Sequence, residues 1–259
     1  MKTIRIDFPE DVKEIEVHPL SDFHIGDTMC DGILIQKVIK HIQDTPNAYC
    51  ILGGDLMDTA IATSVGDTYG ANLQPMEQLK VCVKLFEPIK DKILCILPGN
   101  HENRVYKSDG IDMTAIMAAQ LGLQDRYSAT TALLFLRLGK NDNPTHHGRK
   151  VAYSVYVTHG SGGGRKEGSK INRLVDYAQI VDADVYICGH THSPAVLRTG
   201  YYRVSMANSS VSLVDKLFVN TAACLDYGGY GDTAGFKPAS KVNPVLYFSG
   251  TKHRVSVES

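Results

Sequence analysis

Much of the chain consists of short apolar runs separated by polar segments. Residues 2–8 and 13–19 alternate between polar and apolar positions around Pro9, which predicts an N-terminal β-hairpin. Two runs further along, 131–138 and 151–158, flank a polar loop and predict an antiparallel hairpin. Apolar or alternating composition predicts further strands at 49–52, 93–97, 184–188, 201–205, 217–222 and 245–249. The chain is therefore rich in β-structure.

Segments of helical periodicity lie between several of these strands. Apolar residues recur at helical spacing over 33–42, 77–85, 111–121 and 169–181. Asp31 precedes the first of these segments as a candidate N-cap. Between residues 13 and 97 the order is strand, helix, strand, helix, strand, which is typical of a parallel sheet with right-handed crossovers. The pattern predicts an α/β fold, and we expect one domain over residues 1–259.

Composition narrows the class of protein. The N-terminus lacks the apolar run of a signal peptide, and no stretch approaches the roughly 18 apolar residues of a spanning helix, so we expect a cytoplasmic protein without membrane contact. The six cysteines are scattered without a C-x-x-C pair, which predicts free thiols. Residues 1–100 carry 15 acidic and 9 basic side chains, whereas the remainder carries 13 and 18. This modestly basic second half is compatible with an anionic substrate.

Polar side chains follow the predicted strands at the points where those strands end. Such positions face ligands in open α/β sheets. In an extended segment Asp22 and His24 would point to one face, as would His190 and His192. The other strand-end segments are Gly-Gly-Asp-Leu-Met-Asp at 53–58, Pro-Gly-Asn-His-Glu at 98–102 and Thr-His-Gly at 158–160.

Each of these segments has a simpler interpretation when it is taken alone. Asp22 could cap a turn, Asp55 could cap a helix, and an Asn-His pair after Pro-Gly is commonly only a turn. Together, however, the strand ends supply Asp22, His24, Asp55, Asn100, His159, His190 and His192. This mixture of oxygen and imidazole donors suits Mn²⁺, Fe or Zn²⁺ better than Ca²⁺. The number of donors suits a pair of ions that share a carboxylate.

The motifs D-x-H, G-D-x-x-D, G-N-H-E, H-G and G-H-x-H, in that order from Asp22 to His192, resemble those of the calcineurin-like metallophosphoesterase family. The resemblance implies a four-layer αββα sandwich with mixed sheets flanked by helices, to which the N-terminal hairpin would be an addition. It also implies two divalent ions, Mn²⁺ foremost, with Fe, Zn²⁺ or Ni²⁺ as alternatives.

The resemblance assigns a role to each strand-end residue. The first ion would be held by Asp22, His24 and His192, and the second by Asn100, His159 and His190, with Asp55 as the bridge. His101 would be the general acid, and Asp58 would orient it. Arg104, Arg165 and Lys166 are candidate contacts to substrate, because cationic side chains bind phosphate.

The sequence thus predicts a hydrolase of phosphate esters that uses a dinuclear metal centre and a bridging hydroxide. A phosphodiesterase acting on nucleotides or nucleic acid is the leading hypothesis. A phosphomonoesterase acting on proteins, nucleotides or nucleic-acid ends is the alternative. A non-enzymatic scaffold with the same fold is the third, and the presence of all the expected ligands argues against it.

Overall fold

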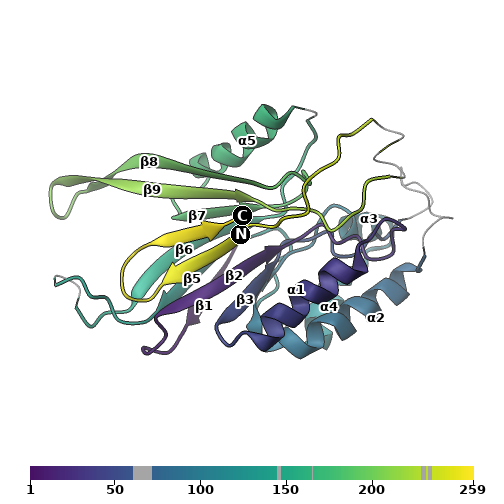
Figure 1. The fold of residues 1–259 in the computed structure, drawn as a ribbon, viewed down its shortest axis with the longest axis horizontal. Coiled ribbons are helices and arrows are strands. Elements are labelled where there is room, and N and C mark those ends of the chain that lie inside the picture. The colour runs from purple at the N-terminus through teal and green to yellow at the C-terminus, as the bar shows by residue number, and fades with distance from the viewer. Residues whose placement is uncertain (61–71, 145–146, 165, 229–231, 233–234) are drawn as a thin grey trace.

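The structure is a computed structural model that describes residues 1–60, 72–144, 147–164, 166–228, 232 and 235–259. Its strands form two mixed sheets (Figure 1). One sheet has the order β1-β5-β6-β7-β9-β8 and the other β11-β10-β2-β3-β4. The strands are β1 (Lys2–Asp7), β2 (Glu14–Leu20), β3 (Ala48–Leu52), β4 (Ile93–Ile96), β5 (Thr131–Leu138), β6 (Val151–Thr158), β7 (Val185–Cys188), β8 (Ala195–Ser205), β9 (Ser210–Asn220), β10 (Val245–Ser249) and β11 (Val255–Glu258).

Helices cover the outer faces of the two sheets (Figure 1). They are α1 (Gly32–Asp44), α2 (Pro75–Phe86), η1 (Glu87–Lys92), α3 (Glu102–Asp109), α4 (Met113–Gln120), α5 (Glu167–Asp176) and η2 (Tyr177–Gln179). The predicted cap of α1 is confirmed, because the Asp31 side chain accepts a hydrogen bond from the Leu34 amide at 3.0 Å. Pro75 occupies the first turn of α2, where its fixed φ suits a helix start.

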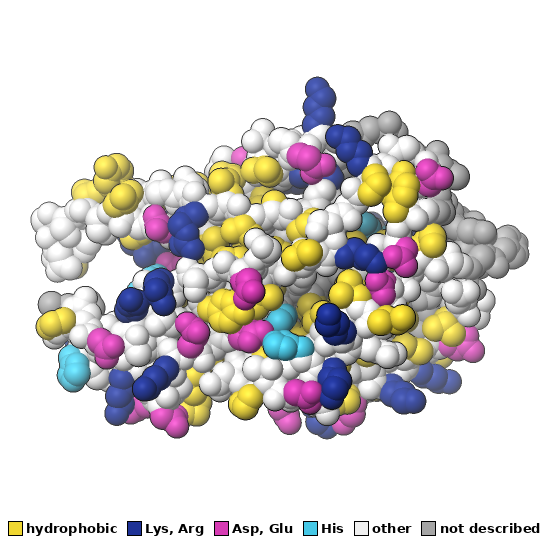
Figure 2. All heavy atoms as spheres, in the orientation of Figure 1, with side chains coloured by type: hydrophobic (Ala, Val, Ile, Leu, Met, Phe, Trp, Pro, Cys, Tyr) yellow, Lys and Arg dark blue, Asp and Glu magenta, His cyan; other side chains and the backbone are white. Residues whose placement is uncertain are grey.

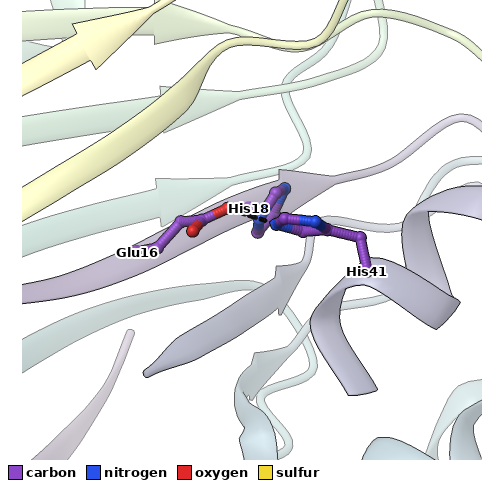
Figure 3. A group of neighbouring side chains, drawn as sticks. All are labelled: Glu16, His18 and His41. Carbon is purple, nitrogen blue, oxygen red and sulfur yellow. Dashed lines mark hydrogen bonds and ion pairs between the residues drawn. The ribbon is translucent and has the colours of Figure 1, made fainter. Parts of the chain in front are cut away.

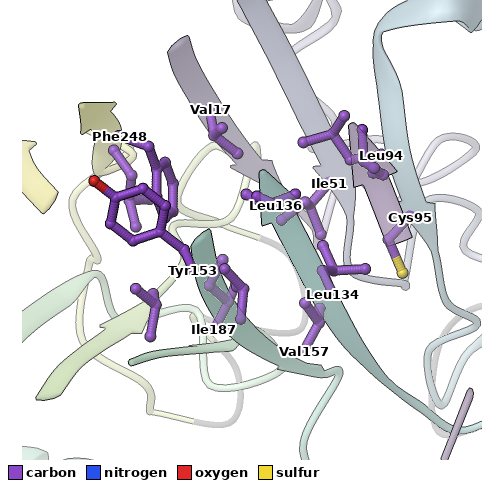
Figure 4. Packing of buried hydrophobic residues seen from close by; sticks show 14 of the residues in the cluster. Val17, Ile51, Leu94, Cys95, Leu134, Leu136, Tyr153, Val157, Ile187 and Phe248 are labelled. Carbon is purple, nitrogen blue, oxygen red and sulfur yellow. The ribbon is translucent and has the colours of Figure 1, made fainter. Parts of the chain in front are cut away.

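The largest apolar core lies between the two sheets. Val17 and Ile51 come from one sheet, and Leu134, Leu136 and other residues of the opposite sheet meet them (Figure 4). A second core packs α1, α2 and α4 against the outer face of β2, β3 and β4. A third, smaller core joins α5 and η2 to the outer face of the other sheet. The predicted four-layer arrangement of helices, sheet, sheet and helices is confirmed.

Strand pairing confirms two predictions and corrects a third. Strands β2, β3 and β4 are parallel, as the alternation of strands and helices predicted, and β5 and β6 form the expected antiparallel hairpin. The predicted N-terminal hairpin is wrong. Strand β1 pairs in parallel with β5, so that Lys2 lies opposite Ala132, whereas β2 belongs to the other sheet. Alternation within a strand identifies its buried face but not its partner.

Helix α3 and the hairpin of β8 and β9 depart from the remaining expectations. Helix α3 lies outside the four segments of helical periodicity that the sequence predicts. Strand β8 begins at Ala195, well before the predicted 201, and with β9 it projects from the body of the molecule (Figure 1). Its tip exposes apolar side chains such as Tyr202 and Met206 (Figure 2). All six cysteines are free, and five are buried. In the described part of the chain, no helix combines the length and apolar character needed to cross a bilayer.

Candidate metal centre

The loops that follow β2, β3 and β4 meet the loops that follow β6 and β7. In each sheet these strands run in parallel, so their carboxyl ends share an edge. Backbone hydrogen bonds tie the loops within each sheet: the Asp22 amide donates to Gly54 O at 3.0 Å, and the Gly189 amide donates to His159 O at 3.1 Å. The two sets of loops meet where the His190 amide donates to the Asp22 carboxylate at 3.1 Å. The predicted convergence of the strand ends is therefore present, and it spans both sheets.

The first group of donors contains Asp22, His24 and His192. His192 Nε2 lies 3.2 Å from Asp22 Oδ1 and 3.1 Å from His24 Nε2. Asp22 is fully buried, and both of its carboxylate oxygens accept from the His190 amide at 3.1 Å. Its second oxygen also accepts from the Ser21 hydroxyl. These contacts hold the carboxylate in one orientation, in which Oδ1 faces His192.

The second group contains Asp55, His159 and His190, with Asn100 between the two histidines. Asn100 Oδ1 lies 2.6 Å from His190 Nδ1 and 3.0 Å from His159 Nε2. Asp55 Oδ2 is 3.2 Å from His159 Nε2. The other nitrogen of His159, Nδ1, lies 2.9 Å from Gly53 O, to which it donates, and this directs Nε2 toward Asn100 and Asp55. Such a bond through the second ring nitrogen is the usual way in which proteins orient a histidine ligand.

The backbone at these positions is left-handed rather than extended. Asp22, His24, Asp55, His190 and His192 have φ angles between 48° and 67°. The expectation that D-x-H and H-x-H act as extended segments is therefore wrong, because β2 and β7 end before these residues. Their side chains converge through tight turns. A non-glycine residue with positive φ is strained, and such strain concentrates at functional sites.

One glycine allows the two loops of the second group to touch. A Cβ on Gly99 would lie 2.0 Å from Asp55 Oδ1 and 2.2 Å from the Asp55 amide nitrogen. No side chain fits there, so the Pro-Gly turn after β4 brings its backbone directly onto Asp55. The His101 amide then donates to Asp55 Oδ1 at 2.8 Å. This contact fixes one oxygen of the carboxylate and leaves the other to face His159.

Glu102 is a residue beside the second group whose contacts were not predicted from the sequence. Its buried carboxylate accepts hydrogen bonds from four backbone amides of two loops. The donors are Asp55 at 3.0 Å, Leu56 at 2.7 Å, Met57 at 3.0 Å and Gly99 at 2.8 Å. Glu102 therefore holds in place the loop that carries Asp55. The only signal in the sequence was its position as the last residue of G-N-H-E.

His101 lies beside both donor groups and is a member of neither. Its Nδ1 is 3.0 Å from Asp58 Oδ1 and 2.9 Å from Asp58 O. Its Nε2 is 3.0 Å from the Arg104 guanidinium, and 3.9 Å from Asp55 Oδ2. Burial by itself lowers the pKa of His101, but the hydrogen bond with Asp58 and the negative charges of Asp55 and Asp58 together outweigh burial, and the pKa is raised.

The charges at the two groups offset one another. Burial by itself raises the pKa of Asp22, but contact with His192 outweighs burial and holds the pKa at about 2. Burial also opposes ionisation of Asp55, yet His159 lowers its pKa, and Asp55 in return raises the pKa of His159 to about 9. Burial lowers the pKa of His24. The negative charges of the buried carboxylates are thus balanced by imidazoles. Bound cations could balance the same charges in their place.

The donor atoms fit divalent transition ions. Two imidazole nitrogens face each other in the first group, and in the second an amide oxygen, a carboxylate and two imidazoles converge. Mixed oxygen and nitrogen donors of this kind suit first-row transition metals, whereas Ca²⁺ takes oxygen ligands. Of the three predicted substrate contacts, Arg104 lies at the site. Arg165 lies outside the described residues, and Lys166 precedes α5 with no hydrogen bond to either group.

Comparison with known proteins identifies the family. A sequence profile described as calcineurin-like phosphoesterase matches residues 20–194, more than half of the chain. No curated protein sequence matches the chain at a significant level.

Among solved structures, a predicted phosphoesterase from Streptococcus pneumoniae shares 12% identity at a TM-score of 0.40, with 95% of this chain and 90% of that one covered. Vps29 of Entamoeba histolytica in complex with zinc shares 12% identity at a TM-score of 0.39, with 94% of this chain and 97% of that one covered. The NAD nucleotidase of Haemophilus influenzae shares 11% identity at a TM-score of 0.37, with 95% of this chain and 49% of that one covered. These TM-scores are too low to carry an argument about function. The match over residues 20–194 contains every motif from Asp22 to His192, and the chain belongs to the calcineurin-like phosphoesterase family.

Proposed function

We propose that the protein hydrolyses phosphate esters with a pair of divalent metal ions, and that Mn²⁺ is the ion best suited to its donors. Asp22, His24 and His192 would hold the first ion. Asn100, His159 and His190 would hold the second, and Asp55 would bridge the two. The observation that carries this proposal is the packing of seven oxygen and nitrogen donors from both sheets into two adjoining groups.

The chain itself supplies proton transfer and orientation. When bound, two such ions acidify water and neutralise charge on phosphoryl oxygens. Asp58 fixes His101 with Nδ1 as the donor, so Nε2 is the atom directed toward the site. Arg104 now donates to this Nε2. A phosphate group that attracted the guanidinium would free Nε2 to carry a proton, which it could then deliver to the leaving oxygen.

A phosphodiesterase acting on nucleotides or nucleic acid is our preferred assignment. The support is the excess of basic side chains after residue 100. Arg104, at the edge of the site, is the cation placed to contact a phosphoryl oxygen. A phosphomonoesterase would use the same groups, so relative turnover of diesters and monoesters decides between the two.

The test is a panel of metals and substrates. Chelated full-length protein is reconstituted with Mn²⁺, Ni²⁺, Zn²⁺ or Mg²⁺, and turnover of bis-p-nitrophenyl phosphate and p-nitrophenyl phosphate is compared. We expect the fastest turnover with Mn²⁺ and the diester. Faster monoester turnover would support the phosphatase assignment. Absence of turnover with every metal, while an active member of the family works in parallel, would support a scaffold.

Matched aspartate variants control this experiment. Asp55→Asn removes the proposed bridge, and we expect both activity and tight binding of the two ions to be lost. Asp215→Asn makes the same chemical change on the exposed β8–β9 hairpin, where the side chain is 60% exposed, and should retain both. Two tightly held ions in Asp55→Asn would show that the bridge lies elsewhere.

A further inference from the structure

A separate group of donor side chains lies on the outer face of β2. Among the described residues, Glu16, His18 and His41 form one further cluster of metal-binding type outside the candidate metal centre (Figure 3). Glu16 Oε1 lies 2.6 Å from His18 Nε2 and 2.7 Å from His41 Nε2. The two imidazole rings are 5.3 Å apart, centre to centre, and inclined at 65°. Both rings therefore present their Nε2 atoms to the same carboxylate oxygen.

The fold places these three residues with little freedom. Glu16 and His18 alternate along β2, so they share the strand face opposite Val17, which points into the core between the sheets. Pairing with β3 on one side and β10 on the other fixes the register of β2. His41 reaches the pair from the last turn of α1. A rigid strand thus supplies two donors and a packed helix the third.

The electrostatics of the cluster favour a bound cation. Glu16 is mostly buried, with 16% of its side chain exposed, and within the described chain its ion-pair partners are these two histidines. A largely buried carboxylate thus stands beside two imidazoles, and both are donor types that zinc binds in proteins.

The present distances are those of hydrogen bonds, and they lie close to those of a metal site. Zinc binds nitrogen and carboxylate oxygen at about 2.0–2.2 Å, which puts tetrahedral ligands roughly 3.3 Å apart. The distances from Glu16 Oε1 to the two imidazole nitrogens would therefore have to increase by less than about 1 Å for zinc to fit. His41 can provide it, because half of its side chain is exposed. The surface beside Glu16 is also hollowed, with Lys13 and Tyr247 among the lining residues.

We propose that Glu16, His18 and His41 bind one divalent transition ion of the zinc type, apart from the candidate metal centre. Two imidazoles and one carboxylate give it three protein ligands, and water completes the coordination. The ion would connect the last turn of α1 to β2. Half of the His41 side chain is exposed, so an ion can enter from solvent.

Counting bound ions tests the proposal. Full-length protein is chelated, dialysed against Zn²⁺ and analysed by mass spectrometry of the metal. We expect His41→Ala to hold one ion fewer than the parent protein. His253→Ala is the matched control, since this histidine is also half exposed and belongs to no donor group, and should hold as many ions as the parent. Equal counts in the parent and in His41→Ala would overturn the proposal.

Two further variants separate this site from the candidate metal centre. In a protein carrying Asp22→Asn and Asp55→Asn, we expect one zinc ion to remain and to disappear when His41→Ala is added. A protein with His41→Cys in place of His41→Ala should bind this ion again, because a thiolate can bind zinc whereas the alanine side chain has no donor atom. If His41→Cys, His41→Ala and the parent protein all bind the same number of zinc ions, His41 is not a ligand and the proposal is wrong.

Discussion

The carboxylate of Glu102 accepts a hydrogen bond from the backbone amide of Asp55 at 3.0 Å, although the two residues are 47 positions apart. With its three other amide partners, this bond makes Glu102 the anchor of the loop after β3. Asp55 has a strained backbone with a φ of 50°, so its conformation depends on such support. Orientation of the carboxylate in the second donor group therefore rests on a residue outside that group.

Glu102→Gln should weaken both the fold and the metal centre. The amide group of glutamine would face backbone N–H donors that the carboxylate now satisfies, at a cost of about 2–3 kcal/mol in the free energy of unfolding. We expect metal affinity or turnover to fall by about 10–100-fold, as for other partners that orient ligands. Urea unfolding and metal titration measure the two effects.

Glu167→Gln is the control for this change. Glu167 is the first residue of α5, as Glu102 is of α3, but 57% of its side chain is exposed. It should leave stability and metal affinity nearly unchanged. Equal behaviour of the two variants would show that the buried hydrogen bonds of Glu102 do not hold the loop.

His101→Asn should retain both metal ions and lose turnover selectively. Asparagine cannot deliver a proton to the leaving group, so substrates with alkyl leaving groups should be affected most. Aryl phosphates, whose leaving groups need no protonation, should lose much less. Steady-state kinetics on paired alkyl and aryl esters measure the difference. Equal losses on both substrates would contradict the proposed role of His101 as an acid.

Gly99→Ala should disrupt the second donor group. The new methyl group would overlap Asp55 Oδ1 and its amide nitrogen, so one of the two loops must move. We expect metal affinity to fall while overall secondary structure persists, as judged by metal titration and circular dichroism. Gly168→Ala is the control, because a Cβ there meets nothing within 4 Å and alanine favours the helix. Tight binding of both ions by Gly99→Ala would show that the contact is dispensable.

Asp184 gives stability that depends on pH. Burial by itself raises its pKa, but hydrogen bonds with His253 and Ser154 lower it below the usual value. Only 12% of the side chain is exposed. A depressed pKa in the folded state means that the stabilisation is complete above the unfolded pKa of about 3.9 and is lost as the pH falls below it. Asp184→Asn should therefore cost about 1–2 kcal/mol at pH 7 and progressively less under acid conditions.

Urea unfolding of both proteins at pH 7, 5, 4 and 3 measures this difference. Asp215→Asn provides the baseline for an exposed aspartate, since 60% of its side chain is exposed. A gap between the parent and Asp184→Asn that widened toward pH 3 would contradict the assigned direction of the pKa shift.

Local signals explain which elements the sequence predicted well. The strand at 245–249 matches β10, and the helix after Asp31 matches α1, because alternation and capping act within a few residues. The strand that pairs with β1 could not be predicted from such local signals. Its pairing of Lys2 with Ala132 depends on the arrangement of the whole sheet, whereas the nearer strand β2 offered an equally suitable pattern.

The donor residues were identified by type and order, but their geometry was not. The rule that alternate residues point to the same face holds only for extended strands. Asp22 and His24 lie instead in a left-handed turn beyond β2. Glu102 was missed for a different reason. A carboxylate that follows a histidine in a polar segment looks like a solvated helix residue until its four amide donors, which come from two loops, are seen.

Neither sheet alone contains a complete donor group. Asp22, Asp55 and Asn100 follow strands of the five-stranded sheet, whereas His159 and His192 follow strands of the six-stranded one. During synthesis, a chain that has emerged only as far as β4 has acquired the carboxylates but not their histidine partners from the other sheet. Capture of an ion by a complete donor group would therefore have to wait for synthesis of both halves of the sandwich, and a captured ion would signal that the two halves have assembled.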